Sequence, residues 1–461
     1  MIARPLSEIA LAVQGQIRGR PGLITSVVTD SRRAGPGALF VALEGERVDG
    51  HAFVPDAMAR GATAALVDRV VGAEPVLVVA DTGRALLALA ADERDRMSGT
   101  KVIGITGANG KTSTKDLTAA VCRTAFRTHA SPASFNNEVG LPMTLLAAEP
   151  GTEVVVAEMG ARREGDVALL CRVARPEVVV VTNVGVAHME IFGSWDAIVR
   201  AGAEPVEWLG ADGVAIVNAD DPVARDYRAR ARVVTFGTDP DADVRAEDVV
   251  LGPDARASFV VRAGSDRARV ELAVPGEHMV SNALAAVACG ISIGIDLDAC
   301  AAALEDARIS PWRMETFETA SGVTVLNDAY NANPESMSAA LKTARWMATG
   351  HRLAAVLGHM AELGPVAFVE HERLGELIVR IGVDRLVTVG EPARQIARAA
   401  IREGQLPQDV ISFDAGDEAA EEVRAWARRG DVVLLKGSRI AGIERVAETL
   451  REAEFEPETT P

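Results

Sequence analysis

The sequence predicts an α/β protein of three units, and three observations lead to that expectation. The chain has 461 residues, which is too long for a single hydrophobic core. Short apolar runs that predict buried strands alternate with helical stretches along most of its length. The rhythm of this alternation starts anew near Lys101 and again near Trp312. We therefore expect domains at residues 1–97, 98–311 and 312–461.

The first unit is expected to be a small α/β domain. A polar stretch at residues 92–100 closes it and predicts a linker. Strands are predicted at residues 23–28, 38–42, 64–67 and 76–79, and helices at 52–60 and 84–96.

The central unit is expected to hold a parallel sheet with helices on both faces, because its strands are apolar on both sides. In residues 242–273 apolar and polar side chains alternate instead, which predicts an antiparallel subsheet. A helix is predicted to follow at residues 281–293. The third unit predicts a Rossmann-like α/β domain, and the tail from residue 452 is expected to fray. Strands are predicted at 102–106, 154–157, 178–181 and 214–217, and then at 323–326, 352–357, 385–389 and 432–435.

Composition and charge exclude several classes of function. The net charge of −17 argues against binding nucleic acid through a basic surface. No apolar run of about eighteen residues predicts a membrane span, and the N-terminus lacks the layout of a signal peptide. The four cysteines are scattered, which predicts buried reduced thiols rather than a zinc site or disulfides. We expect a cytoplasmic protein that is a monomer.

A glycine-rich loop follows the first predicted strand of the central unit. Residues 107–114 read G-A-N-G-K-T-S-T and lead into a helix predicted at 112–125. Backbone N–H groups of such a loop and the helix N-terminus bind phosphate, and glycines permit the close approach. Lys111 would neutralise the terminal phosphates, and the Thr112 hydroxyl would reach Mg²⁺. The loop predicts a P-loop ATPase-type sheet that binds ATP; a plain strand-to-helix turn is the alternative.

Polar side chains also follow other strands of the predicted central sheet. In open α/β sheets, ligands bind beyond the carboxyl ends of the strands. Glu158 ends one strand and suits a Mg²⁺ ligand, the alternative being an exposed helix cap. Asn183 and His188 follow another, and His188 is a candidate for metal or phosphate contact, the alternative being a structural histidine. Asn136 and Asn137 form a polar loop that could line the same cleft.

Segments in all three units together resemble one family. In chain order they read T-D-S-R, T-G-A-N-G-K-T-S-T, N-N-E-V-G-L-P, A-E-M-G, T-N-V-G-V-A-H, W-R-M-E, D-A-Y-N-A-N-P and K-G-S-R. This set is similar to that of the Mur ligases, the ATP-dependent amide-forming enzymes of peptidoglycan precursor synthesis. The resemblance covers nearly the whole chain. It implies a UDP-substrate-binding N-terminal domain, a central ATP-binding domain and a C-terminal ligase domain.

The resemblance also implies roles for individual residues. Asn282 would contact the adenine of ATP, Asp328 the ribose and Arg313 the phosphates. The residues implied in catalysis are Lys111, Glu158 and His188, and those implied as Mg²⁺ ligands are Thr112, Glu158 and His188. The implied ATP contacts are Gly107, Asn109, Gly110, Lys111, Thr112, Ser113, Asn282, Arg313 and Asp328. The implied contacts to the UDP-linked substrate and the peptide are Ser31, Asn136, Asn137, Tyr330, Asn331 and Asn333.

Two motifs favour one substrate pair within the family. The D-A-Y-N-A-N-P segment and the doubled asparagine at 136–137 resemble members that add D-alanyl-D-alanine to UDP-N-acetylmuramoyl-tripeptide. The D-Y-A-H segment and the D-N-P-R loop of members that add the third residue do not occur in this sequence. The resemblance therefore implies these two substrates beside ATP and Mg²⁺. A sibling ligase that adds a single amino acid, or a nucleotide-binding module without catalysis, are the alternatives.

The sequence departs from the family pattern in three places. Mur ligases carry a lysine, which is carbamylated and helps to hold the second Mg²⁺, where this chain has Gly202. We hypothesise that Glu204 or Glu207 supplies the missing negative charge, or that fewer protein ligands hold that metal. The alternative is that this segment is plain helix surface. Trp312 replaces a glycine of the family, and His359 replaces an aspartate.

Overall fold

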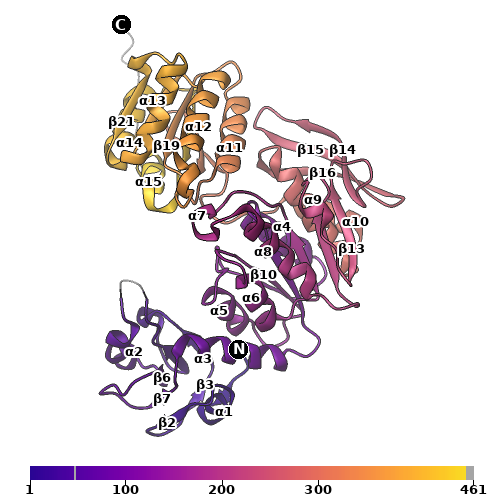
Figure 1. Ribbon diagram of the computed structural model, residues 1–461, viewed down its shortest axis with the longest axis vertical. Helices are drawn as coiled ribbons and strands as arrows, with labels where there is room; N and C mark the ends of the chain where they lie inside the picture. The colour runs from indigo at the N-terminus through magenta and orange to yellow at the C-terminus, as the bar shows by residue number, and fades with distance from the viewer. Residues whose placement is uncertain (46–47, 453–461) are drawn as a thin grey trace.

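The protein folds as three α/β units that follow one another along the chain, as the computed structural model in Figure 1 shows. The structure describes residues 1–45 and 48–452, so the predicted frayed tail lies, from residue 453 on, outside it. The central unit lies between the two others (Figure 1). The predicted α/β fold class is confirmed. Within the described residues, no helix has the length and apolar character that a membrane span requires.

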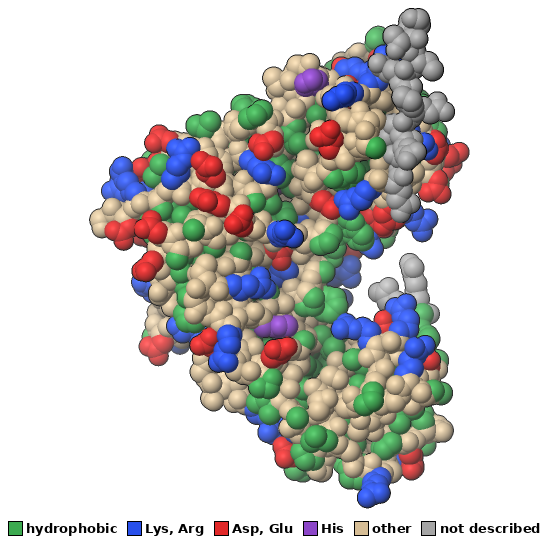
Figure 2. Space-filling model, turned by 180° about the vertical axis from the view of Figure 1, so that it is seen from behind, with side chains coloured by type: hydrophobic (Ala, Val, Ile, Leu, Met, Phe, Trp, Pro, Cys, Tyr) green, Lys and Arg blue, Asp and Glu red, His purple; other side chains and the backbone are tan. Residues whose placement is uncertain are grey.

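The surface seen from behind mixes charges of both signs. Figure 2 shows acidic and basic side chains interspersed over this face. A notch at one edge separates the lobe of the N-terminal unit from the C-terminal unit above it (Figure 2). The two outer units are therefore joined mainly through the central one.

The N-terminal unit is built on a five-stranded sheet of order β2-β7-β6-β5-β4. Alternate residues of β5 face opposite sides: Leu39 packs with α1 and α3, whereas Phe40 packs with α2. The strand predicted at 23–28 is in fact two strands, since β3 pairs with β1 while β4 joins the sheet beside β5. The elements are β1 (Arg4–Pro5), α1 (Leu6–Ala12), β2 (Gln16–Arg18), β3 (Leu23–Ile24), β4 (Ser26–Val28), β5 (Ala38–Val41), α2 (Val54–Ala59), β6 (Ala64–Val67), β7 (Val76–Val78) and α3 (Thr82–Arg96).

The central unit holds a nine-stranded sheet of order β16-β15-β14-β13-β12-β11-β8-β10-β9. The predicted antiparallel subsheet is not separate, because β14 pairs in parallel with β13 and so continues the main sheet. The strands are β8 (Lys101–Thr106), β9 (Thr128–Ala130), β10 (Val154–Glu158), β11 (Val178–Val181), β12 (Val214–Asn218), β13 (Arg232–Gly237), β14 (Val244–Leu251), β15 (Arg256–Ala263) and β16 (Asp266–Pro275). The helices are α4 (Lys111–Arg123), α5 (Gly140–Ala147), α6 (Asp166–Ala174), α7 (Met189–Phe192), α8 (Trp195–Trp208), α9 (His278–Ser292) and α10 (Leu297–Glu305).

Strand β8 has β10 and β11 as its two neighbours, and all three run in parallel. Their carboxyl ends therefore meet at one edge of the sheet, and the loops that follow them open onto the same space. The apolar faces of these strands are buried, and α9, which is rich in alanine, packs closely on α4. This packing fixes the loop between β8 and α4.

The C-terminal unit holds a six-stranded sheet of order β17-β18-β22-β19-β20-β21, in which only β17 is antiparallel to its neighbour. Strands β18 and β22 are adjacent, so Asp328 and Lys436 at their ends are register partners. The strands are β17 (Glu315–Glu318), β18 (Thr324–Asp328), β19 (Leu353–Gly358), β20 (Arg385–Val389), β21 (Val410–Phe413) and β22 (Val432–Lys436). The helices are α11 (Pro334–Met347), α12 (Ala367–Ile381), α13 (Arg394–Glu403), α14 (Gly416–Trp426) and α15 (Glu444–Glu452).

Candidate active site

One large cavity, of about 1080 Å³, is lined by residues of both the central and the C-terminal unit. Most of the site residues that the sequence predicts lie around it. Ser31 is not among them, because it lies in the N-terminal unit, and Gly107 lines a smaller cavity next to it. The predicted residues that line the large cavity are Asn109, Gly110, Lys111, Thr112, Ser113, Asn136, Asn137, Glu158, His188, Asn282, Arg313, Asp328, Tyr330, Asn331 and Asn333.

The phosphate loop between β8 and α4 is held in a fixed conformation. Gly110 has a φ of +78°, and a Cβ added there would lie 2.4 Å from Oδ1 of Asn282, so only glycine fits. Lys111 Nζ donates hydrogen bonds to the carbonyl oxygens of Gly107 and Ala108, at 2.6 and 3.1 Å. Burial lowers the pKa of Lys111, while the Glu158 carboxylate opposes this shift. The ammonium group is thus held by the loop itself, beside the large cavity.

Glu158 is an almost fully buried carboxylate, with 1% of its surface exposed. Its Oε1 accepts a hydrogen bond from Asn136 Nδ2 at 2.7 Å. Its Oε2 is buried and has no hydrogen-bond partner within the described residues. A buried carboxylate oxygen without a partner is costly unless a cation compensates it. The alternative interpretation of Glu158 as an exposed helix cap is therefore wrong, and this oxygen fits a Mg²⁺ ligand.

The Thr112 hydroxyl lies in the same cavity and accepts a hydrogen bond from Arg313 Nη2 at 3.1 Å. In the described part of the chain, no group of three or more His, Cys, Asp and Glu side chains is arranged to hold a metal. Mg²⁺ commonly binds through one or two carboxylates together with substrate phosphates. The donors present, one free carboxylate oxygen and one hydroxyl, fit that mode of binding.

His188 meets a partner that the sequence did not point to. Its Nδ1 hydrogen-bonds to Oε2 of Glu362, which comes from the loop after β19 in the C-terminal unit. The other oxygen of Glu362 accepts from Arg162 Nη2 at 2.7 Å. Burial and the nearby Lys111 charge lower the pKa of His188, and the Glu362 carboxylate opposes them. No local signal predicted this contact, because 174 residues separate His188 from Glu362.

The structure contradicts the hypothesis that Glu204 replaces the charge of the family's lysine. The Glu204 carboxylate accepts the backbone N–H groups of Gly165 and Ala168, at 2.5 and 2.8 Å, and so caps the start of α6. Glu207 is exposed, and neither glutamate lines the cavity. Beside Gly202 lies the Tyr227 hydroxyl, only 2.5 Å from where a Cβ would be. A longer side chain at position 202 therefore has no room while this tyrosine stays in place.

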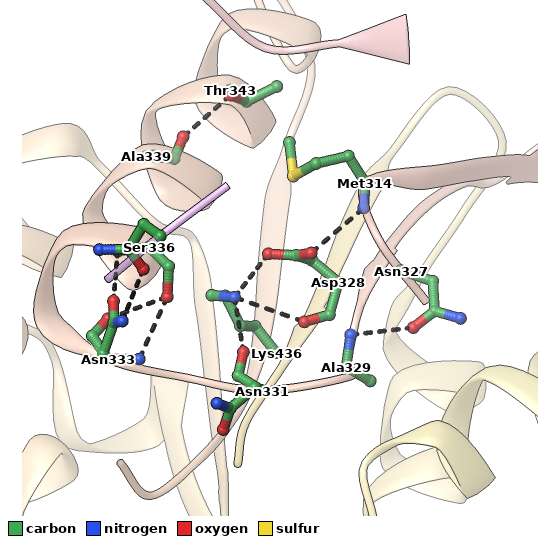
Figure 3. A network of polar contacts seen from close by, with 11 residues as sticks. Met314, Asn327, Asp328, Ala329, Asn331, Asn333, Ser336, Ala339, Thr343 and Lys436 are labelled. Atoms are coloured by element: carbon green, nitrogen blue, oxygen red, sulfur yellow. Dashed lines mark hydrogen bonds and ion pairs between the residues drawn. The ribbon is translucent and has the colours of Figure 1, made fainter. Parts of the chain in front are cut away.

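Asp328 forms a buried ion pair that the sequence analysis missed. Figure 3 shows Lys436 Nζ directed at the Asp328 carboxylate and at the backbone oxygen of Asn331, at 2.5 and 2.9 Å. Burial lowers the pKa of Lys436, and the Asp328 charge opposes this. The K-G-S-R turn was the available signal, since it places a lysine at the end of a strand. Asp328 Oδ1 also accepts from the Met314 backbone N–H at 3.2 Å.

The segment after Asp328 links the C-terminal unit to the phosphate loop. Asn333 caps α11 by accepting the Ser336 N–H at 2.9 Å, and Ser336 Oγ accepts the Asn333 N–H in return (Figure 3). Asn333 Nδ2 also donates to Oδ1 of Asn109 at 2.6 Å. Tyr330 lies under the Arg313 guanidinium, 4.0 Å from it. These contacts place polar side chains of the central and the C-terminal unit around the large cavity.

Asn137, Trp312 and His359 are three further positions that the sequence singled out. Oδ1 of Asn137 accepts the Gly140 N–H at 2.8 Å at the start of α5, so this side chain shapes the loop. Trp312 has a φ of +61°, a left-handed backbone that favours glycine, and its ring centroid lies 4.5 Å from the central carbon of the Arg439 guanidinium. His359 follows β19 outside the cavity lining.

Comparison with known proteins gives the family. The Mur ligase middle domain matches residues 105–290, the Mur ligase glutamate ligase domain residues 312–439, and the Mur ligase family catalytic domain residues 23–93. The chain belongs to the Mur ligase family. Sequence relatives are named UDP-N-acetylmuramoyl-tripeptide–D-alanyl-D-alanine ligase. That of Mycobacterium tuberculosis is 40% identical, with 92% of each chain covered, and that of Escherichia coli 34% identical, with 98% of this chain and 99% of the relative covered.

Solved structures of Mur ligases have the same arrangement. A crystal structure of MurF from Acinetobacter baumannii superposes with a TM-score of 0.86 at 32% identity, covering 98% of this chain and 100% of that one. MurF from Thermotoga maritima in complex with ADP superposes with a TM-score of 0.80 at 29% identity, covering 93% and 97%. The three-unit architecture of this Mur ligase is therefore that of its family.

Proposed function

We propose that this chain joins D-alanyl-D-alanine to UDP-N-acetylmuramoyl-tripeptide at the cost of ATP, a step of peptidoglycan precursor synthesis. The observation that carries the proposal is the shared cavity, in which the phosphate loop and Glu158 face the segment from Asp328 to Ser336. An amide ligase needs such a space, because nucleotide, carboxylate and amine must meet there. The names of relatives that are 34–40% identical over nearly their full length support this choice of substrates.

The chemistry requires that the carboxylate acquires a better leaving group. A carboxylate oxygen of the tripeptide attacks the γ-phosphorus of ATP, the bond from that phosphorus to ADP breaks, and an acyl phosphate forms. The amine of D-alanyl-D-alanine then attacks the acyl carbon, phosphate leaves with the electron pair of the C–O bond, and the amine loses a proton. Both steps gather negative charge in one place. Catalysis therefore depends mostly on positioning and on neutralising charge.

The nucleotide side of the cavity supplies that neutralisation. Lys111 lies in the phosphate loop and would move from its carbonyl partners to the terminal phosphates. Arg313, which now donates to Thr112, would contact the phosphates from the C-terminal unit. Thr112 and Glu158 would hold one Mg²⁺ and His188 a second, and the charge of these ions would neutralise phosphate oxygens. The remaining proposed nucleotide contacts are Gly107, Asn109, Gly110, Ser113, Asn282 and Asp328.

The substrate side is proposed to extend into the N-terminal unit. Ser31 would contact the UDP-linked substrate there, and Asn136 and Asn137 would line its path towards Glu158, to which Asn136 already donates. Tyr330, Asn331 and Asn333 would face the peptide from the C-terminal unit. We propose residues 1–97, 98–311 and 312–461 as the three functional domains, and a monomer working in the cytoplasm, where ATP is available.

The direct test is a ligation assay with defined acceptors. The full chain is incubated with ATP, Mg²⁺ and UDP-N-acetylmuramoyl-tripeptide, with either D-alanyl-D-alanine or single amino acids, while phosphate release and product mass are followed. Phosphate release and a product heavier by one D-alanyl-D-alanine unit are expected only with the dipeptide. A product with a single amino acid would identify a sibling ligase. Nucleotide binding without ADP release for any acceptor would identify a non-catalytic module.

A further inference from the structure

Glu362 of the C-terminal unit contacts His188 of the central unit. This contact determines which of the two ring nitrogens of His188 is protonated. An ionised carboxylate can only accept hydrogen bonds, so the His188 nitrogen that meets it, Nδ1, must be the donor. The second oxygen of Glu362 is occupied by Arg162 at 2.7 Å. Both side chains of the Glu362–His188 pair are about 70% shielded, with 30% and 28% of their surface exposed. The contact is therefore half-buried and directional.

The backbone around this pair is also specified. The Glu190 N–H donates to the Glu362 carbonyl oxygen at 3.2 Å, so the loop after β19 is fastened to the start of α7. His188 and Glu362 each have a φ of +60°, a left-handed conformation that non-glycine residues adopt rarely. Such residues are strained and persist where the surrounding structure holds them in place, often at functional sites. A Cβ added at Gly364 would lie 3.0 Å from Glu190, so the two segments are in close contact.

With Nδ1 protonated and held, Nε2 is the ring nitrogen of His188 that keeps a lone pair. No hydrogen bond to Nε2 occurs within the described residues. His188 lines the large cavity together with Glu158 and Thr112. Metal-binding histidines commonly donate their other ring N–H to a carboxylate, which fixes the tautomer and the orientation of the ring. The pair has this arrangement, although its two members come from different units.

We propose that Glu362 is a positioning residue for His188. It fixes the Nδ1–H tautomer and aims the Nε2 lone pair into the cavity, so a histidine competent to bind metal is present only when the C-terminal unit is docked on α7. The inference rests on the proposed function in taking His188 as a Mg²⁺ ligand. Docking of the unit that carries Asp328 and Arg313 would thus also complete the metal site.

The experiment compares the full-length wild type with Glu362→Ala and Glu362→Gln. The matched control is Glu370→Gln, which breaks an ion pair with Arg373 on α12 of the same unit. Long-range ¹H–¹⁵N NMR of the imidazole, without nucleotide or metal, reports the tautomer of His188, which is assigned by its loss in His188→Gln. Electron paramagnetic resonance of Mn²⁺ in the presence of ADP reports metal affinity. Neither measurement requires ligation.

The wild type and the control are expected to show the Nδ1–H tautomer. Glu362→Ala should shift His188 towards Nε2–H and weaken Mn²⁺ binding about 10–100-fold, and Glu362→Gln should do so less, because its amide oxygen still accepts. An unchanged tautomer or unchanged Mn²⁺ affinity in Glu362→Ala would overturn the inference, even if ligation were lost. If Glu362→Ala showed both changes relative to the wild type, but the wild type joined no D-alanyl-D-alanine, the proposed function would be refuted and the positioning role supported.

Discussion

The phosphate loop and the surroundings of His188 line the same cavity but are built in different ways. The loop is one contiguous segment between β8 and α4, whose glycines and backbone groups form the binding surface. His188, in contrast, depends on Glu362 from another unit, and Gly202 nearby depends on Tyr227. A site made of backbone groups is specified by its local sequence. A site made of side chains from distant segments depends on how those segments pack together.

The surroundings of Gly202 illustrate this dependence on a distant segment. Where the family pattern has a lysine, this chain has no side chain, and the Tyr227 hydroxyl occupies the adjacent space and donates to the Val199 carbonyl oxygen at 2.8 Å. The space beside position 202 is therefore filled by a residue 25 positions further along the chain. The phosphate loop offers no comparable freedom, since at Gly110 the backbone conformation and the contact with Asn282 both require glycine. The two regions should thus respond differently to substitution.

The largest effect is expected in the phosphate loop. Lys111→Ala should lower the rate of ADP release by about 10²–10³, because one preorganised charge contact to the developing transition state is lost. Stability should change little, since Lys111 bonds only to carbonyls of its own loop. Stopped assays of ADP and thermal unfolding measure the two quantities. Lys101→Ala, at the exposed start of β8, is the control and should retain wild-type turnover; near-normal turnover of Lys111→Ala would contradict the assignment.

The same contrast explains what the sequence could predict of the fold. The all-valine strand β11 and the strand β20 have the predicted bounds, because runs apolar on both faces are readable wherever helices cover a sheet. Strand β13 was not predicted, since its first half is exposed and carries Arg232. The run at 23–28 gave two strands because two different partners divide it at Thr25. Pairing between distant strands is not encoded in any local window.

The candidate site shows the same limit. Motifs with fixed local spacing, such as the phosphate loop and the segment from Asp328, placed their residues around the cavity. Lys436 and Glu362 were missed as site residues, because their partners are 108 and 174 residues away. Glu204 was one alternative for the missing charge, and its proximity to Gly202 in the sequence did not show that its carboxylate turns to the start of α6. Contacts across units depend on how the units dock, which local patterns do not carry.

The next largest effect is expected on stability, and it tests the close contact between Gly202 and Tyr227. Gly202→Ala would put a Cβ 2.5 Å from the Tyr227 hydroxyl and should destabilise the protein by about 1–3 kcal/mol through overpacking. In a Tyr227→Phe background the nearest ring atom is 3.4 Å away, so the same change should instead stabilise helix α8 by about 0.5–1 kcal/mol. Denaturant unfolding of the wild type, the two single variants and the double variant measures both free-energy changes. Equal effects in the two backgrounds would show that Tyr227 does not determine what fits at position 202.

A smaller effect is expected where the C-terminal unit meets the phosphate loop. Asn333→Ala removes the cap of α11 and should cost about 0.5–2 kcal/mol of stability, whereas Asn333→Ser keeps a good capping residue. Both variants lose the bond to Asn109, so both should bind ADP more weakly than the wild type. Unfolding and calorimetric titration with ADP separate the two roles. If Asn333→Ser bound ADP like the wild type, the link to Asn109 would be irrelevant to the nucleotide.

The smallest effect is expected at Glu204, and it bears on how the metal is held. Since its carboxylate caps α6 outside the cavity, Glu204→Gln should leave Mn²⁺ affinity in the presence of ADP unchanged. Electron paramagnetic resonance of Mn²⁺ measures this, with Glu158→Gln as the variant that should weaken binding. Weaker Mn²⁺ binding in Glu204→Gln would restore the hypothesis that this residue replaces the family's lysine.

The same variant also has an expected signature in the pH dependence of stability. Burial raises the pKa of Glu204 above its unfolded value. A carboxyl with a raised folded pKa binds more protons when folded, so its contribution to stability is fully present below the unfolded pKa and is lost as pH rises through the folded one. The wild type should therefore gain stability relative to Glu204→Gln when the pH is lowered from neutral towards the pKa of an exposed glutamate. Urea unfolding at several pH values measures this difference, and a difference that does not change with pH would mean that the charge of Glu204 is not opposed by its surroundings.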